Sequence, residues 1–289
     1  MKNGKKKRRD YWECNVVEKF SVSMCVYGGD NPEWFSVAVD SILNQTVTPD
    51  EVVLVVDGPV PETLDRIICG YEKDPSFQVI RLEQNMGHGE ARRTGLQACR
   101  YDLVALMDAD DISTPERFEK QLRAFDSVPG LTIVGGDITE FVDVPSNLVG
   151  ARTVFTEDSQ IKQDMKKRCP MNQVTVMFRK AAVERVGGYQ DWYCDEDYYL
   201  WLRLMLNGAV FANIREPLVN VRGGKEMYQR RGGLKYFRSE AKLQNWMYKK
   251  KVIDLGTYTA NVAKRLIVQV LLPNRLRGWI FQRFARKPV

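Results

Sequence analysis

The sequence predicts a doubly wound α/β domain. Three observations support this prediction. Strand-like and helix-like segments alternate from residue 20 to about residue 131. The segment EVVLVVDG (51–58) is a continuous apolar run of the kind found in buried parallel strands. Acidic residues follow this strand and the strand that starts at residue 103, at the strand ends where ligands bind in such sheets.

Each element of this first half has its own signal. Residues 20–27 (FSVSMCVY) are rich in β-forming types, and Asn31-Pro32-Glu33 marks the start of a helix that runs to about Asn44. LVALMDADDIS (103–113) begins as an apolar strand and ends in acids. The other segments in this half are a helix near 61–73, a strand at 78–82, a turn at 85–89, a helix at 90–100 and a helix starting at Ser113 or Thr114.

After residue 131 the rhythm changes. TIVGGDITEFVDV (132–144) predicts longer strands, and DEDYYLWLRLMLNG (195–208) predicts a strongly amphipathic helix that ends at its glycine. The remaining predictions are a helix at 157–168, a strand leading into a helix at 173–180, and two last strands, VFANI (210–214) and LVNVR (218–222).

Charge is divided unevenly along the 289 residues. The net charge of +6 combines +5 on residues 1–10, −12 on residues 11–224 and +13 on residues 225–289. An acidic body can hold a cation, and basic ends can meet an anionic surface, either a membrane or nucleic acid. The acidic body and the absence of an aromatic RNA-binding signature argue against nucleic acid.

Cysteine and histidine usage limits the other possibilities. The six cysteines are scattered without a CxxC pair and His88 is the one histidine, so zinc would have few ligands. We expect a reduced, cytoplasmic protein. The charged start lacks the apolar segment of a signal peptide, and no apolar run approaches the length of a membrane span.

The acids after the strands are the main candidates for chemistry. Asp57 ends one apolar strand, and Asp108, Asp110 and Asp111 follow another. Carboxylates favour hard cations such as Mg²⁺ or Mn²⁺, and a cation would let these acids accept a diphosphate that they would otherwise repel. The alternatives are a turn residue at Asp57 and a helix cap at Asp110, Asp111 or Ser113.

Six segments in order then resemble one family: FSVSMCVY, DSILNQT, EVVLVVDG, NMGHGEARRTGL, LVALMDADD and DEDYYLWLRL. Together they resemble the family-2 glycosyltransferases with the GT-A fold, and most closely the bacterial enzymes that build capsule, exopolysaccharide or O-antigen chains. The resemblance covers about residues 20–222. It implies a mixed, mainly parallel Rossmann-like sheet with helices on both faces. The basic amphipathic pattern of residues 258–287 predicts a helical tail after this domain.

The resemblance also implies an inverting, metal-dependent hexosyltransferase that takes a nucleotide-sugar donor, usually a UDP-sugar, and a glycan or polyprenyl-linked acceptor. The family often has Asp-Asp-Gly-Ser where this chain has Val56-Asp57-Gly58-Pro59, so its base specificity stays open. The implied donor contacts are Val26 and Tyr27 at the nucleoside, Asp57 at the uracil, Arg92 near the pyrophosphate with Arg93 beside it, Asp108 at the ribose or a metal-bound water, and Asp110 on Mn²⁺ or Mg²⁺.

The general base is expected in Asp195-Glu196-Asp197, where the family carries Glu-Asp. Asp197 is the first choice and Glu196 the second; alternatively, the acids only complement a helix dipole. Trp192 and Tyr193 precede them and either stack on an acceptor sugar or pack in the core. His88 lies in a glycine-flanked turn, where it contacts a phosphate or is a plain loop residue.

The chain is expected to divide into a basic extension (1–19), a GT-A domain (20–222) and a C-terminal segment (223–289). Arg230 and Arg231 lie between glycine pairs, in a loop that is a candidate to cover the donor. The basic amphipathic stretches 258–272 and 274–287 favour peripheral binding to the inner face of the cell membrane, or docking on the protein's own core. A nucleotidyltransferase is the competing enzyme class, but YGGDNPEW lacks the lysine expected after its first strand.

Overall fold

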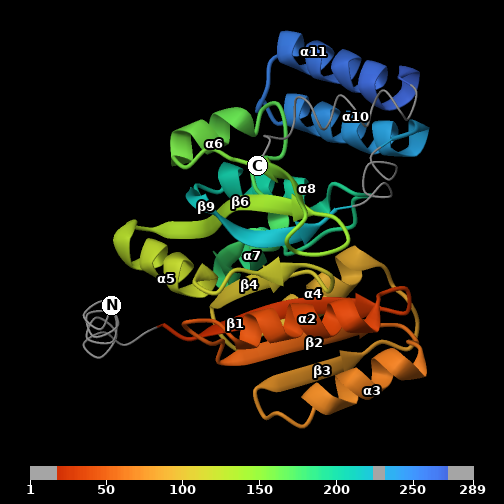
Figure 1. The fold of residues 1–289 in the computed structure, drawn as a ribbon. Coiled ribbons are helices and arrows are strands. Elements are labelled where there is room, and N and C mark those ends of the chain that lie inside the picture. Colours follow the sequence, from red (N-terminus) through yellow and green to blue (C-terminus); the bar gives the residue numbers. More distant parts are fainter. Residues whose placement is uncertain (1–17, 224–231, 273–289) are drawn as a thin grey trace.

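The structure, a computed structural model, describes residues 18–223 and 232–272. Within these residues the strands form one nine-stranded sheet in the order β3-β2-β1-β4-β8-β6-β9-β5, with β7 paired to β6 (Figure 1). The elements of the first half are β1 (Phe20–Tyr27), α2 (Pro32–Leu43), β2 (Glu51–Asp57), α3 (Glu62–Tyr71), β3 (Phe77–Arg81), α4 (His88–Ala98) and β4 (Leu103–Met107).

The second half adds the other side of the sheet and a C-terminal helical hairpin. Its strands are β5 (Ile112–Ser113), β6 (Leu131–Phe141), β7 (Leu148–Arg152), β8 (Met177–Arg179) and β9 (Val210–Arg222). Its helices are α5 (Arg117–Ser127), α6 (Asp158–Asp164), the 3-10 turn η1 (Gln173–Thr175), α7 (Lys180–Arg185), α8 (Glu196–Leu206), α10 (Leu234–Lys249), α11 (Leu255–Leu266) and the π-helical turn η2 (Ile267–Leu271).

Parallel pairing in the first half sets the position of the strand ends. β1 lies between β2 and β4, with Tyr27 opposite Asp57 and Met24 opposite Met107. Helix α2 begins as the sequence predicts, because the side chain of Asn31 accepts hydrogen bonds from the backbone N–H groups of Glu33 and Trp34. The predicted α/β fold is therefore confirmed for this half.

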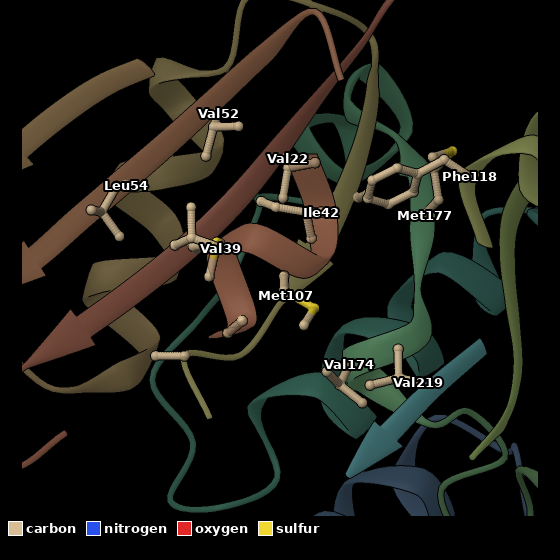
Figure 2. Close-up of a cluster of buried hydrophobic side chains, with 14 of the residues drawn as sticks. Val22, Val39, Ile42, Val52, Leu54, Met107, Phe118, Val174, Met177 and Val219 are labelled. Carbon is tan, nitrogen blue, oxygen red and sulfur yellow. The ribbon is translucent and has the colours of Figure 1, made fainter. Parts of the chain in front are cut away.

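Side chains alternate between two cores, one on each face of the sheet. On one face α2, α3 and α5 pack on strand residues such as Val22 and Leu54, and Figure 2 shows Val39 and Ile42 of α2 against them. On the other face α4, α6, α7, α8 and α10 cover residues such as Val104. Helices on both faces bury the central strands completely, as their continuous apolar runs require.

The structure corrects four details of the sequence prediction. Helix α5 begins at Arg117, because residues 112–113 pair with β9 as a short strand. The strand-to-helix segment at 173–180 opens with a 3-10 turn. Strand β8 runs antiparallel to both β4 and β6, so the sheet is more mixed than expected. The two last predicted strands form a single strand, β9, which continues through Pro217. The proline is tolerated because the pairing of β9 with β6 shifts register there.

The C-terminal segment is helical as far as it is described. Helices α10 and α11 pack side by side as a hairpin at the end of the molecule opposite β3 and α3 (Figure 1). In residues 18–223 and 232–272 no helix has the length and hydropathy needed to cross a membrane. The stretch 274–287 and the start of the chain lie outside the described residues.

Candidate active site

The predicted donor residues lie along one edge of the sheet. Val26 and Tyr27 end β1, Asp57 ends β2, and Asp108 follows β4 directly. Because these three strands are parallel neighbours, their carboxyl ends meet at the same edge. Tyr27 is half exposed there, whereas Val26 is buried. Arg230 and Arg231, also predicted as donor contacts, lie outside the described residues.

Asp57 holds the loop that leads into α4. Its two carboxylate oxygens accept hydrogen bonds from the backbone N–H groups of Met86 and Gly87, at 2.7 and 3.0 Å. Gly58 makes this approach possible: its φ is +84°, and a Cβ there would lie 2.5 Å from the nitrogen of Asn85. Asp57 thus connects the end of β2 to the start of the helix that carries Arg92.

Arg92 joins the donor acids to the predicted base. Its side chain is only 6 % exposed; Nη1 donates to Oδ1 of Asp197 at 2.8 Å, and Nη2 donates to Oδ1 of Asp108 at 3.3 Å. The same Nη1 lies 3.6 Å from Oε1 of Glu196. Burial alone would lower the pKa of Arg92, but its attraction to Asp197 and Asp108 outweighs burial and raises it. The guanidinium is therefore a fixed positive charge between the two sets of acids.

Close helix packing brings Arg92 to this position. Gly95 faces the sheet one turn after Arg92, and a Cβ at Gly95 would lie 2.7 Å from Oγ of Ser23 and 3.3 Å from a methyl carbon of Val55. The missing side chain lets α4 approach β1 and β2 closely. Arg93 points elsewhere: it donates to the carbonyl of Tyr189 and pairs with Glu90.

Asp197 has the protonation behaviour expected of a general base. It is the second residue of α8 and keeps 21 % of its side chain exposed. Burial raises its pKa to about 7; Arg92 opposes this rise, and the charges of Glu196 and Asp108 add to it. A carboxyl with a pKa near neutral is half ionised at physiological pH and can take a proton from a sugar hydroxyl.

The acids around β4 separate into structural and accessible groups. Asp111 is buried and accepts a hydrogen bond from the backbone N–H of Arg222 at 2.8 Å. Burial and the neighbouring Asp110 raise the pKa of Asp111 well above the usual range. Asp108 and Asp110 are partly exposed. The alternative of a helix cap is wrong, because α5 begins six residues or more after them and has no side-chain cap.

The oxygen donors of Asp108 and Asp110 fit Mg²⁺ or Mn²⁺. In the part of the chain that the structure describes, no group of three or more His, Cys, Asp or Glu side chains is arranged to hold a metal. Two carboxylates are the usual protein share for a cation that also binds substrate phosphates. The donor set is therefore compatible with a metal that arrives with a diphosphate.

Two residues of the site were missed by the sequence interpretation. Asp30 accepts a hydrogen bond from the backbone N–H of Tyr27. Burial raises the pKa of Asp30 to about 6, and the charges of Asp110 and Asp108 add to the rise. Arg222 donates to the carbonyl of Asp110 at 3.2 Å and lies over the ring of Trp34. Asp30 lies three residues after the end of β1, so its position after a strand was a usable signal; Arg222 had none.

A small pocket lies on the donor side of the site, beside Arg92 and Asp108. His88 is the first residue of α4, and its Nδ1 lies 3.8 Å from Oε1 of Glu196, so it is part of the site and not only a loop residue. Burial raises the pKa of the Cys25 thiol to about 12, which leaves it protonated and unsuited to act as a nucleophile. The pocket is lined by Ser23, Cys25, His88, Arg92, Leu106, Met107, Asp108 and Gln173.

The two aromatic residues before Asp197 differ in exposure. Trp192 is 9 % exposed and belongs to the core around α8 and α10. Tyr193 is 43 % exposed, and the ammonium of Lys235 lies over its ring. The hydroxyl of Ser239 in α10 donates to the carbonyl of Tyr193 at 2.6 Å, which attaches the C-terminal hairpin to the loop before Asp197.

Known proteins resemble this chain in sequence. The sequence model of Glycosyl transferase family 2 matches residues 21–187, more than half of the chain. An uncharacterized glycosyltransferase of Haemophilus influenzae is 38% identical over 269 residues, 93% of this chain and 100% of that protein. The UDP-Gal:alpha-D-GlcNAc-diphosphoundecaprenol beta-1,3-galactosyltransferase of Escherichia coli is also 38% identical, over 93% of this chain and 97% of its own length.

Solved structures share the fold. The S. aureus TarS 1–349 structure in complex with UDP-GlcNAc aligns with a TM-score of 0.65 at 16% identity, over 91% of this chain and 79% of that one. The mannosyltransferase PcManGT from Pyrobaculum calidifontis, in complex with GDP-Man and Mn²⁺, aligns with a TM-score of 0.57 at 14% identity, over 94% and 77%. The family match and the two relatives show that this chain belongs to glycosyl transferase family 2 and is a glycosyltransferase with the GT-A fold.

Proposed function

We propose that the enzyme transfers a hexose, with inversion at the anomeric carbon, from a UDP-sugar to a glycan carried on a polyprenyl diphosphate. The observation that carries this proposal is the junction at Arg92, which bonds to Asp108 on the donor side and to Asp197 on α8. The E. coli relative, whose name states a UDP-sugar donor and a diphosphoundecaprenol-linked acceptor, supports these substrate classes.

The donor side has a division of labour. Val26 and Tyr27 lie where a nucleoside would rest, and the buried Asp57 keeps lone pairs that can accept a uracil N–H beside the two backbone groups it already binds. Arg92 offsets the negative charge of the diphosphate. Asp108 and Asp110 would hold Mn²⁺ or Mg²⁺, which when bound supplies positive charge for the leaving nucleoside diphosphate.

The base acts on the acceptor side. A single in-line displacement needs one group that removes the acceptor hydroxyl proton while the new bond forms. Asp197 suits this role because its pKa lies near 7 and its carboxylate is held by Arg92 at 2.8 Å. Glu196 is the second choice, since its oxygen lies farther from Arg92, at 3.6 Å.

Inversion and donor class have a direct test. The purified protein is incubated with Mn²⁺ and α-linked UDP-, GDP- and dTDP-sugars, together with a soluble GlcNAc-α-diphosphate-alkyl acceptor. We expect transfer from a UDP-sugar and a β-linkage in the product, read from its proton NMR coupling constant. An α-linkage contradicts inversion, and transfer only from GDP- or dTDP-sugars contradicts the donor assignment.

We also propose that α11 rests on the inner face of the cell membrane. The helix turns polar side chains toward the protein: Asn261 donates to Gln244 and to the carbonyl of Lys166, and Arg265 pairs with Glu240. Its outer surface and the following turn leave apolar side chains exposed, namely Leu255, Leu266, Ile267 and Leu271. An exposed apolar face beside basic residues is typical of an interfacial helix. Helix α11 can therefore pack on the protein with its polar side and contact a lipid surface with its apolar side.

A further inference from the structure

We propose that Lys235 and Lys242 of α10 bind the diphosphate of the acceptor, so that these two lysines, with Arg238 between them, select a lipid-diphosphate-linked glycan. This inference rests on the proposed function and adds a recognition site for its acceptor. The two lysines are seven residues apart and Arg238 lies between them, so all three share one side of the helix. All three are exposed.

The row formed by Lys235, Arg238 and Lys242 lies beside the loop that leads to Asp197. The ammonium of Lys235 is 4.0 Å from the ring centroid of Tyr193, and that of Lys242 is 4.3 Å from the ring centroid of Trp192. Ser239, on the neighbouring turn, bonds to the carbonyl of Tyr193 and accepts from the indole of Trp192. Both ammonium groups therefore lie against the loop that precedes Asp197.

Distance along the chain keeps this row near the chemistry. Tyr193 and Asp197 are four positions apart in the sequence, a span of at most about 14 Å even if the chain were extended. The backbone N–H of Asp195 bonds to the carbonyl of Trp192, so the loop turns and the true separation is shorter. A single sugar with its diphosphate can reach across such a gap.

Charge explains why an acceptor diphosphate needs this row. Glu196 and the ionised form of Asp197 make the start of α8 acidic, and their charges would repel a diphosphate placed one sugar away. Lys235 lies in the first turn of α10, where the helix dipole disfavours a cation and where no acid is present to offset it. A bound diphosphate would remove both disadvantages at once.

The half-exposed ring of Tyr193 fits the same ligand. Lys235 lies over the ring, and the exposed part of the ring can pack against the acceptor sugar. The donor diphosphate is directed elsewhere, to the sheet edge at Arg92, Asp108 and Asp110. The membrane-facing residues of α11 also lie on a different helix, so the acceptor diphosphate is the occupant that this position favours.

The direct test is binding of decyl diphosphate, measured by isothermal titration with UDP and Mn²⁺ present. Loss of a charged hydrogen-bonding partner typically weakens binding about tenfold, so we expect about tenfold for Lys235→Gln or Lys242→Gln and roughly a hundredfold for the double variant. Lys249→Gln is the matched control: it changes the same charge on the same helix, about 21 Å along the axis from Lys235, and should leave affinity unchanged. Equal loss in the control, no loss in the double variant, or no binding by the wild-type protein would overturn the proposal.

Two further measurements separate this site from the proposed function and from the membrane. In transfer assays the double variant should raise KM for GlcNAc-α-diphosphate-alkyl while KM for a neutral GlcNAc-α-alkyl acceptor stays the same; equal effects on both acceptors refute diphosphate recognition. Wild-type protein that binds decyl diphosphate through these lysines but transfers to neither acceptor contradicts the proposed function alone. Co-sedimentation of the double variant with anionic vesicles should match the wild type, and a large loss there would reassign the lysines to lipid headgroups.

Discussion

Replacing Asp197 by Asn tests the proposed chemistry most directly. The asparagine keeps an oxygen that can accept the hydrogen bond from Arg92, and Arg92 also keeps Asp108 at 3.3 Å and Glu196 at 3.6 Å. The guanidinium is therefore not left buried without a partner, and the fold should persist. The amide cannot take a proton, so we expect kcat to fall about 10²–10⁴-fold, the usual contribution of a general base.

The pH dependence of the wild-type enzyme gives an independent reading of the same group. Because the pKa of Asp197 is raised to about 7, the rate should rise with pH and reach half its plateau near pH 7. At pH 6 only roughly one tenth of the carboxyl is ionised, so kcat should be about tenfold below the plateau. The expected slope is positive, since the ionised form is the active one.

The raised pKa also predicts a stability effect of the opposite sense. Between the ordinary pKa of an aspartate and pH 7, the folded protein holds a proton that the unfolded chain releases. The free energy of unfolding therefore falls as pH rises through this window, and above pH 7 Asp197→Asn should be at least as stable as the wild type. Urea denaturation at pH 5 and pH 8 measures this difference.

The assays distinguish catalysis from binding. Sugar transfer is followed with a radiolabelled UDP-sugar under saturating conditions, and UDP affinity is measured by titration calorimetry; only the first should change in Asp197→Asn. Activity within threefold of the wild type, or a flat profile between pH 6 and pH 8, would refute the assignment. An inactive Glu196→Gln beside an active Asp197→Asn would move the base by one residue.

Three other outcomes are expected. Asp110→Asn should abolish the rise in Tm that UDP and Mn²⁺ produce together, without changing Tm in their absence; full UDP affinity in the presence of a chelator counts against the metal role. Arg265→Met should lower the free energy of unfolding by about 3–5 kcal/mol in urea denaturation, because it leaves the charge of Glu240 unpaired in a site where both side chains are about 10 % exposed. Adding Glu240→Leu should recover most of this loss. A cost below about 1 kcal/mol for Arg265→Met alone contradicts the reasoning. Ile267→Glu with Leu271→Glu should reduce co-sedimentation with anionic vesicles at unchanged Tm, and undiminished binding would remove α11 from the membrane interface.

The first half of the fold was predictable because its signals are local. Each central strand is a continuous apolar run, and α2 has a capping residue and a proline at its start. The second half depends on pairing between distant segments. Strand β8 inserts antiparallel between β4 and β6, and the short strand at Ile112–Ser113 forms only because β9 reaches it. Neither pairing leaves a periodic pattern in the sequence.

The candidate site shows the same division. The sequence singles out three acids by their position: Asp57 at the end of a strand, Asp108 directly after a strand, and Asp197 at the start of a helix. Ligand-binding and catalytic carboxylates are common at such positions. The contact between Arg92 and Asp197 spans 105 residues, and only the packing of α4 and α8 on the same face of the sheet creates it. Arg222 escaped prediction for the same reason, since its partners come from the loop after β4.

The acidic start of α8 has neighbours on two sides, one of which is the C-terminal hairpin. Arg92 of α4 bonds to Asp197, while Glu240 of α10 and Arg265 of α11 lie near Asp195. Burial raises the pKa of Asp195 to about 8, with Glu240 adding to the rise and Arg265 opposing it, so Asp195 keeps its proton at neutral pH and adds no charge beside the base.

The proposed base and the hairpin next to it lie beyond the family match at residues 21–187. Asp197 follows that range, and the hairpin that fixes the preceding loop through Ser239 and Tyr193 follows it by still more. A chain cut after β9 would lose Glu240 and Arg265 together, along with the contacts that hold Tyr193. Such a protein should lose transfer, because the orientation of Asp197 depends on both sides of α8, and it should also be less stable, because Leu243 and Met247 of α10 are buried in the core.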